Sequence, residues 1–402
     1  MTSQAVKVRR VQVGVGMAAA VLAAAIFTVG AAADRRSPDT STTTGGVTTT
    51  LASGAGGVVP GGAAPAPGPP SATTRMTPGR VITGAISPKS VAASGEGHVF
   101  AQNMMYTHSV TVYDAGGQLT KTIGDAVDLS GVGLPGHPGV VKGAPVETAF
   151  SPDRRFAYVS NYSMFGPGFA RPGDDVCKPG RFDNSYVYRV DVATMAIDAV
   201  YPVGSVPKFV AVTPDNRYLL VTNWCSYDLS VLDTATGATV KRIPLGPYPR
   251  GIVVDPTSTT AYVAVMGTTS IARIRLSDLS TTWIRGIGAG PRHLVIDPAG
   301  AWLYVTLNGG DQVAKVDLAS GKVVARRTTG NAPRSMTIAP DGQSLYVVNY
   351  DSDTVTKLRA ADMAVLQTLP TKVNPIGITY EPVSRTVWVA CYSGSIMIFK
   401  DG

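Results

Sequence analysis

The chain has 402 residues, of which 44% are apolar and 15% are charged, and it contains 44 glycines and 29 prolines. This composition excludes an acidic disordered protein and a charge-rich helical protein, and it favours a large β-type domain with additional segments. The formal net charge is +8, but residues 1–79 hold six basic and two acidic residues and so account for +4 of it. The remaining charge is too small for a general binder of nucleic acid.

The first predicted element is an apolar segment near the N-terminus. Three basic residues precede a run over residues 13–33, which is 21 residues long and interrupted only by Thr28. A helix of this length spans roughly 30 Å, the thickness of the hydrocarbon core of a bilayer. Residues 1–33 are therefore either an uncleaved signal anchor, which the length favours, or a signal peptide cleaved at the alanines of 31–33. Both interpretations place residues 34–402 outside the cytoplasm, attached to a membrane through the N-terminal helix only or secreted.

The next segment, residues 34–79, is rich in threonine, serine, glycine, alanine and proline. It has too little apolar bulk to offset the entropy that ordering would cost, so we predict a disordered linker. The linker precedes one domain, residues 80–402.

A period of 42 residues organises that domain. Two series of prolines share this spacing: Pro207, Pro249, Pro291, Pro333 and Pro375 form the first, and Pro214, Pro256, Pro298, Pro340 and Pro382 form the second. Pro145 and Pro152 continue the two series upstream after an insertion of 20 residues, and Pro88 begins a still earlier copy. Self-similarity at this period predicts a repeat architecture of seven copies.

Each copy is predicted to form four short strands. In the copy that begins at Pro207, apolar runs at 209–212, 218–222, 229–233 and 239–243 are separated by turn residues. Four strands in about 40 residues are typical of one blade of a β-propeller. The fold class predicted is therefore all-β, a seven-bladed β-propeller.

The two ends of the domain indicate how the ring closes. The last copy stops after three strands, and an additional strand at residues 80–86 precedes the first copy. We expect this N-terminal strand to complete the seventh blade, because closure removes the exposed sheet edge that an open stack would present.

A short signature at the end of the second strand supports this assignment. It reads Tyr158-Val159-Ser160-Asn161, Leu220-Val221-Thr222-Asn223, Tyr304-Val305-Thr306 and Tyr346-Val347-Val348-Asn349. In this signature the chain resembles the YVTN-type β-propeller repeat proteins, a family of exported and surface-layer proteins. The resemblance covers residues 80–402 and implies an envelope-associated binding or scaffold module, without implying any activity. The signature asparagine is absent at Val265, Leu307 and Cys391.

Basic side chains are predicted to surround the mouth of the central channel. In five of the seven copies a lysine or arginine follows the proline of the first series: Lys89, Lys208, Arg250, Arg292 and Arg334. Rotation about the propeller axis would repeat these side chains as a cation ring, which would concentrate anions. The alternative interpretation is that they are ordinary solvated residues of surface loops.

Aromatic residues recur in the loop after the signature, on the same face of the propeller. They are Tyr162, Trp224, Tyr350 and Tyr392. Beside the signature asparagines they would suit a sugar ring or another planar group, so we predict that they line the ligand site with the cation ring. Alternatively, the asparagines cap turns and the rings pack between blades.

Two long connections on this face, at residues 124–143 and 164–184, also favour a binding role, because long loops in compact domains usually carry function. Cys177 lies in the second of them and Cys225 in the matching loop of the adjacent blade. A disulfide between them is expected in an oxidising compartment, whereas Cys391 has no partner.

No motif for a metal, haem or other cofactor is found among the four histidines and three cysteines, and no catalytic residue is predicted. We therefore expect a non-catalytic module that binds an anionic glycan, peptide or envelope protein, and no nucleic acid. The alternative is a lactonase-like hydrolase at the same channel mouth, with Glu147 or His293 as the acid–base group, with or without a metal ion.

Overall fold

The computed structural model describes residues 68–134 and 136–402, which belong to a compact unit spanning residues 64–402. The predicted signal segment and residues 34–67 of the predicted linker lie outside the described residues. Within the described residues, no helix is both long enough and apolar enough to cross a membrane.

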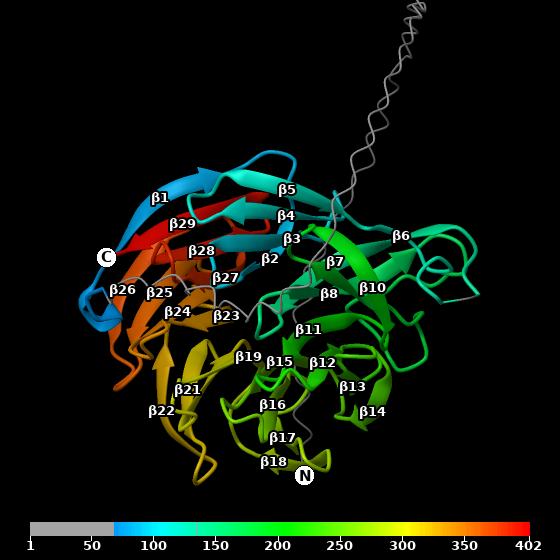
Figure 1. Ribbon diagram of the computed structural model, residues 1–402. Coiled ribbons are helices and arrows are strands. Elements are labelled where there is room, and N and C mark those ends of the chain that lie inside the picture. The colour runs from blue at the N-terminus through cyan, green and yellow to red at the C-terminus, as the bar shows by residue number, and fades with distance from the viewer. Residues whose placement is uncertain (1–67, 135) are drawn as a thin grey trace, which may run out of the picture. The chain divides into compact units, whose positions relative to one another are not determined.

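Seven antiparallel sheets surround a central axis (Figure 1). In each sheet the strand that contains the proline of the first series is innermost, and each inner strand packs against the inner strands of the two neighbouring sheets. Because these contacts run around all seven sheets and return to the first, the ring is closed. The predicted all-β, seven-bladed architecture is confirmed.

The first four blades follow in chain order. Blade 1 comprises β2 (Pro88–Ala93), β3 (His98–Asn103), β4 (Ser109–Asp114) and β5 (Leu119–Gly124). Blade 2 comprises β6 (Ala126–Asp128), β7 (Val140–Phe150), β8 (Phe156–Phe165), β9 (Tyr186–Asp191) and β10 (Ala196–Pro202). Blade 3 comprises β11 (Pro207–Val212), β12 (Tyr218–Asn223), β13 (Asp228–Asp233) and β14 (Thr239–Pro244). Blade 4 comprises β15 (Pro249–Val254), β16 (Thr260–Val265), β17 (Ser270–Arg275) and β18 (Ser280–Ile284).

The remaining blades complete the ring. Blade 5 comprises β19 (Pro291–Ile296), β20 (Trp302–Leu307), β21 (Gln312–Asp317) and β22 (Lys322–Thr328). Blade 6 comprises β23 (Pro333–Ile338), β24 (Ser344–Asn349), β25 (Thr354–Arg359) and β26 (Val365–Pro370). Blade 7 comprises β27 (Pro375–Glu381), β28 (Thr386–Cys391), β29 (Ser395–Asp401) and β1 (Met76–Ile82), and a short 3-10 helix, η1 (Ser71–Thr73), precedes β1.

The N-terminal strand closes the seventh blade, but it begins earlier than the sequence predicts. β1 pairs with β29 over residues 76–82 rather than 80–86, and Figure 1 shows the two strands side by side in blue and red. The predicted linker boundary at 79 is therefore wrong. Met76 is buried among the side chains of blades 6 and 7, and the backbone and hydroxyl of Ser71 both donate hydrogen bonds to Asp341. These contacts hold a segment whose composition indicates disorder.

The core lies between the blades. The signature tyrosines of the second strands, Tyr158, Tyr304 and Tyr346, are at most 2% exposed and pack against the next sheet around the ring. Burying large rings between sheets removes apolar area from water, and these tyrosines do so beside the valines and leucines of the same clusters. The signature therefore encodes the packing of the ring.

Candidate functional site

The cation ring lies at the start of the inner strands. The chain enters β11, β15 and β23 through a left-handed residue, Val206, Tyr248 or Ala332, followed directly by the proline. The residue after the proline is therefore the second residue of an inner strand rather than part of a loop. In blades 2 and 7 the same position holds the buried apolar residues Val146 and Ile376.

The structure brings the five basic side chains together. Burial lowers the pKa of Lys89, and the positive charges of Arg250, Arg292 and Lys208 lower it further, while Glu147 opposes them. Arg334 belongs to the same cluster. Burial is the largest cause of the lowered pKa of Arg292, and the charges of Arg250 and Arg334 lower that pKa further. Charges influence one another in this way only at short range, so the side chains converge on one mouth of the channel.

The interpretation as solvated loop residues is wrong, because four members of the ring are buried. Lys89 and Lys208 are each 3% exposed, Arg250 is 6% exposed and Arg292 is 7% exposed, whereas Arg334 is partly buried. The ring therefore lies inside the mouth and not on the outer rim.

The two lysines and the three arginines differ in their partners. Lys208 forms an ion pair of 2.6 Å with Asp175, and Lys89 lies 3.7 Å from Glu147. Across residues 68–134 and 136–402, no carboxylate forms an ion pair with the arginine triad, which comprises Arg250, Arg292 and Arg334. The Nε atoms of Arg292 and Arg334 are buried without a hydrogen-bond partner. Donors left in this state cost free energy, and an anion would satisfy them.

Arg292→Met is expected to stabilise the protein. The substitution keeps the aliphatic stem but removes a buried charge that has like charges around it and no carboxylate partner among the described residues, so the free energy of unfolding should rise by about 1–3 kcal/mol. Urea unfolding followed by circular dichroism measures this change, with the exposed Arg285→Met as the matched control, expected to stay within about 0.5 kcal/mol. A loss of stability on Arg292→Met would contradict the assignment of Arg292 as an unpaired charge.

The predicted aromatic residues contact the cations. The Nζ of Lys208 lies 4.2 Å from the ring centre of Tyr162 and 5.3 Å from that of Trp224. The guanidinium of Arg334 covers the face of Tyr350 at 3.5 Å, and Tyr392 meets Tyr350 edge to face at 6.1 Å. Contacts of this kind stabilise a buried cation that has lost most of its hydration, so the aromatic side chains help to hold the cation ring in place. Burial raises the pKa of Tyr392 to about 12, so its hydroxyl remains a hydrogen-bond donor at neutral pH.

The signature asparagines of blades 3 and 6 form hydrogen bonds within their own blades. Asn223 accepts a hydrogen bond from the Gly204 amide and donates to Asp228 and Ser230. Asn349 accepts from the Thr329 hydroxyl and donates to the hydroxyls of Thr354 and Thr356. Their side chains are fully buried. They therefore fix the loop that leads into the same blade, and the expectation that they contact a ligand does not hold.

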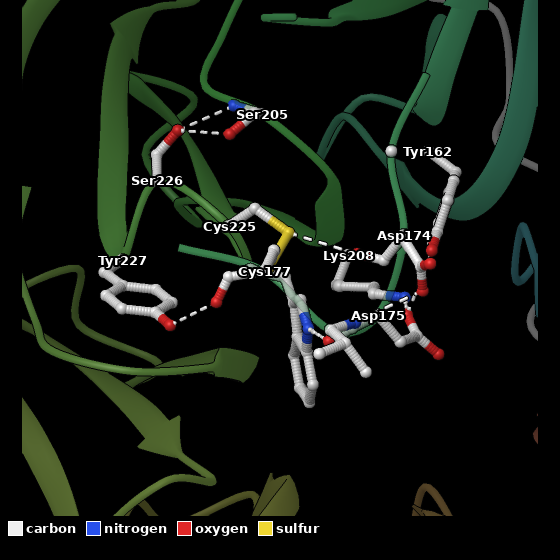
Figure 2. Close-up of a disulfide and its surroundings, with 12 residues drawn as sticks. Tyr162, Asp174, Asp175, Cys177, Ser205, Lys208, Cys225, Ser226 and Tyr227 are labelled. Carbon is white, nitrogen blue, oxygen red and sulfur yellow. Dashed lines mark hydrogen bonds and ion pairs between the residues drawn. A yellow bond between two sulfur atoms is a disulfide. The ribbon is translucent and has the colours of Figure 1, made fainter. Parts of the chain in front are cut away.

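A carboxylate that sequence reasoning missed, Asp175, also lies at the mouth. It belongs to the 164–184 connection, and its Oδ1 accepts hydrogen bonds from Lys208 and from the Tyr162 hydroxyl (Figure 2). Burial alone would raise the pKa of Asp175, but Lys208 and Arg250 outweigh it and hold the pKa below its usual range. The Asp175 side chain is 67% exposed, so the carboxylate is accessible from solvent at the mouth.

Cys177 and Cys225 form a disulfide, with their Cα atoms 5.5 Å apart. It fastens the connection that carries Asp175 to blade 3, two residues after that carboxylate (Figure 2). The Trp224 indole donates to the Asp175 carbonyl, and the Tyr227 hydroxyl donates to the Cys177 carbonyl. These three links keep Asp175 over the mouth.

His293 lies next to the ring, in β19. Its Nδ1 accepts a hydrogen bond of 2.8 Å from the Met336 amide, so the neutral ring carries its proton on Nε2. The His293 imidazole contacts the Phe209 ring of blade 3, at 5.0 Å between ring centres. Blade 4 lies between these two blades and has Gly251 at this level, where a side chain would collide with the backbone of Arg292 and His293. Burial, assisted by Arg250 and Arg292, lowers the pKa of His293 to about 3. A proton-transfer group at neutral pH needs a pKa nearer 7, which argues against an acid–base role.

The histidine predicts a pH dependence of stability. Because its pKa is about 3 in the folded state and about 6.5 in the unfolded chain, the unfolded state binds more protons between these values. Stability from this group is thus complete above pH about 6.5 and falls by about 1.4 kcal/mol for each pH unit below it. Urea unfolding of the wild type and of His293→Asn between pH 7 and about 4.5 measures this, since asparagine keeps an acceptor near Nδ1 but does not titrate. Equal pH slopes for the two proteins would contradict it.

Below the ring the channel holds a cavity of about 300 Å³, lined by the inner strands of all seven blades and including Glu147, His293 and Ser335. In the described part of the chain, no group of three or more histidine, cysteine, aspartate or glutamate side chains is placed to hold a metal ion.

Comparison with known proteins gives the fold and little else. No protein-family model matches the chain, and no curated protein matches its sequence. Among solved structures it is similar to hydrazine synthase from Kuenenia stuttgartiensis, with a TM-score of 0.62 and 18% sequence identity over 79% of this chain and 97% of that chain. A likeness at this identity supports the β-propeller architecture, on which many unrelated functions occur.

Proposed function

We propose that this protein is an exported, envelope-associated β-propeller of the YVTN type. It acts as a non-catalytic binding module, and its channel mouth binds the anionic part of a glycan, peptide or protein. The observation that carries this proposal is the arginine triad, in which two arginines are at most 7% exposed and none has an ion-pair partner among the described residues.

The chemistry of the triad favours an anion. A guanidinium presents several donors in a planar fork that matches a carboxylate or a phosphate, and such charge-assisted hydrogen bonds are stronger than neutral ones. Because the triad is screened from water, an anion that enters gains more than it would on an exposed surface. The triad is thus suited to an anionic ligand, and without a ligand its unpaired buried charges lower the stability of the protein.

The disulfide supports the proposed location. Structural disulfides persist in oxidising compartments and are rare in the cytosol, where thiols are kept reduced. The Cys177–Cys225 bond therefore agrees with a domain that lies outside the cytoplasm.

A binding screen tests the proposed function. Isothermal titration of the purified protein with anionic and neutral envelope glycans and peptides is expected to give binding for anionic members only, and binding should weaken strongly as salt is raised. Binding of neutral glycans with equal affinity, or no binding of any anionic ligand, would contradict it. Hydrolysis of a lactone panel that is lost on Glu147→Gln would instead favour the lactonase alternative.

A further inference from the structure

The channel mouth has two unlike halves. On the side of blade 3, Asp175 forms an ion pair with Lys208, at 2.6 Å. On the side of blades 4, 5 and 6, the arginine triad has no such partner in the described part of the chain. The protein therefore supplies an anion of its own to one half of the ring and leaves the other half free.

Asp175 is still exposed to solvent at the mouth. Both of its hydrogen bonds to side chains, from Lys208 and from Tyr162, end on Oδ1, and the side chain keeps 67% of its surface exposed. Among the described residues no hydrogen bond ends on Oδ2, so the carboxylate keeps an exposed negative charge at the mouth. The charge of Asp175 also acts on Arg292 and on Tyr392, so it reaches across the mouth.

The burial of the arginines limits the shape of a ligand. With Arg250 at 6% and Arg292 at 7% exposure, a polymer that lies across the face of the propeller cannot bring its internal charges to these guanidiniums. A compact anionic group at the end of a molecule can enter the channel mouth and reach them. A second anionic group next to the first would approach Asp175 and be repelled.

We propose that the mouth binds one compact terminal oxyanion, a carboxylate or a phosphate monoester, on Arg250, Arg292 and Arg334, and that Asp175 is the specificity-determining residue that excludes polyanions. This inference rests on the proposed function and adds the class of ligand and the residue that selects it.

Isothermal titration with four probes tests the inference: inorganic phosphate, phenyl phosphate, acetate and linear polyphosphate. The wild type should bind phosphate or acetate and bind polyphosphate more weakly per mole of phosphoryl groups. Asp175→Asn keeps the shape of the side chain but removes its charge, so it should tighten binding of inorganic phosphate on the order of tenfold and of polyphosphate by more. Comparing phenyl phosphate with acetate distinguishes a phosphate from a carboxylate ligand.

Asp174→Asn is the matched control, because it makes the same charge change one residue away, where the side chain does not contact Lys208. It should alter the affinity for phosphate by less than about twofold. Circular dichroism and thermal unfolding verify that each variant is folded, and Asp175→Ala provides the same test if the asparagine variant is not.

The outcomes separate the two claims. If the wild type binds compact oxyanions but Asp175→Asn binds them no more tightly than Asp174→Asn, the role given to Asp175 is wrong and the proposed function survives. Polyphosphate binding by the wild type that equals or exceeds phosphate binding would overturn the class of ligand. If neither the wild type nor any folded variant binds any of the four probes, the proposed function itself fails.

Discussion

Replacing Asp401 with alanine is expected to lower the free energy of unfolding by about 3–5 kcal/mol. The Asp401 carboxylate pairs at 2.6 Å with the Nζ of Lys357, and both side chains are 0% exposed. It also accepts hydrogen bonds from Tyr346 and Thr74. Without the carboxylate, the buried ammonium of Lys357 would keep its hydrogen bonds to Thr74 and its contact with the Tyr346 ring, which cannot compensate a full charge.

This cluster joins three parts of the ring: the segment before β1, the last residues of β29 and the neighbouring blade 6. Urea unfolding of Asp401→Ala measures its contribution. The matched control is Asp362→Ala, which removes an exposed partner of Arg359 and should cost less than about 1 kcal/mol. The double variant Lys357→Met with Asp401→Leu should recover most of the loss, because it removes both charges together. Equal effects of Asp401→Ala and Asp362→Ala would show that the buried pair does not stabilise ring closure.

Reversing two charges of the triad, with Arg250→Glu and Arg292→Glu together, is expected to weaken anion binding by at least about a hundredfold. The two new carboxylates would repel the ligand and would pair with the cations that remain, Arg334 and Lys89 among them. Because each introduced glutamate finds an opposite charge nearby, the fold should tolerate the change.

Titration of the tightest anionic ligand from the screen into this double variant measures the loss. The control is Arg275→Glu with Arg359→Glu, which reverses two exposed arginines at the far ends of β17 and β25, away from the mouth. This control should bind within about threefold of the wild type, since exposed charges at that distance are screened. A folded Arg250/Arg292 variant with unchanged affinity would place the anion site elsewhere.

Repetition made most of the fold predictable. The prolines of the first series mark the inner strands, and the tyrosines of the signature mark the interfaces between blades, so strand order follows from the period alone. The start of β1 could not be predicted, because a single buried residue, Met76, ends a segment whose composition is otherwise that of a linker. A tertiary contact decides the structure there, and composition does not reveal it.

The candidate site was predictable only in part, for the same reason. Lys208 and Arg250 occupy equivalent repeat positions, so the pseudo-symmetry of the repeats is enough to predict that they lie together. Asp175 belongs to an insertion that no other copy contains, so symmetry says nothing about it. The burial of the ring was also missed, because basic residues after a proline are typical of exposed turns, whereas here the proline already lies within the strand.

The proposed function depends on an anion site at the arginine triad, inside the channel mouth. The most direct measurement is a crystal structure of the protein soaked with selenate, a tetrahedral oxyanion whose selenium is located by anomalous scattering. We expect a selenium peak at the mouth, with selenate oxygens about 3 Å from the guanidinium nitrogens of at least two of Arg250, Arg292 and Arg334. Selenate found at other positions in the crystal, with no peak at the mouth, would contradict it.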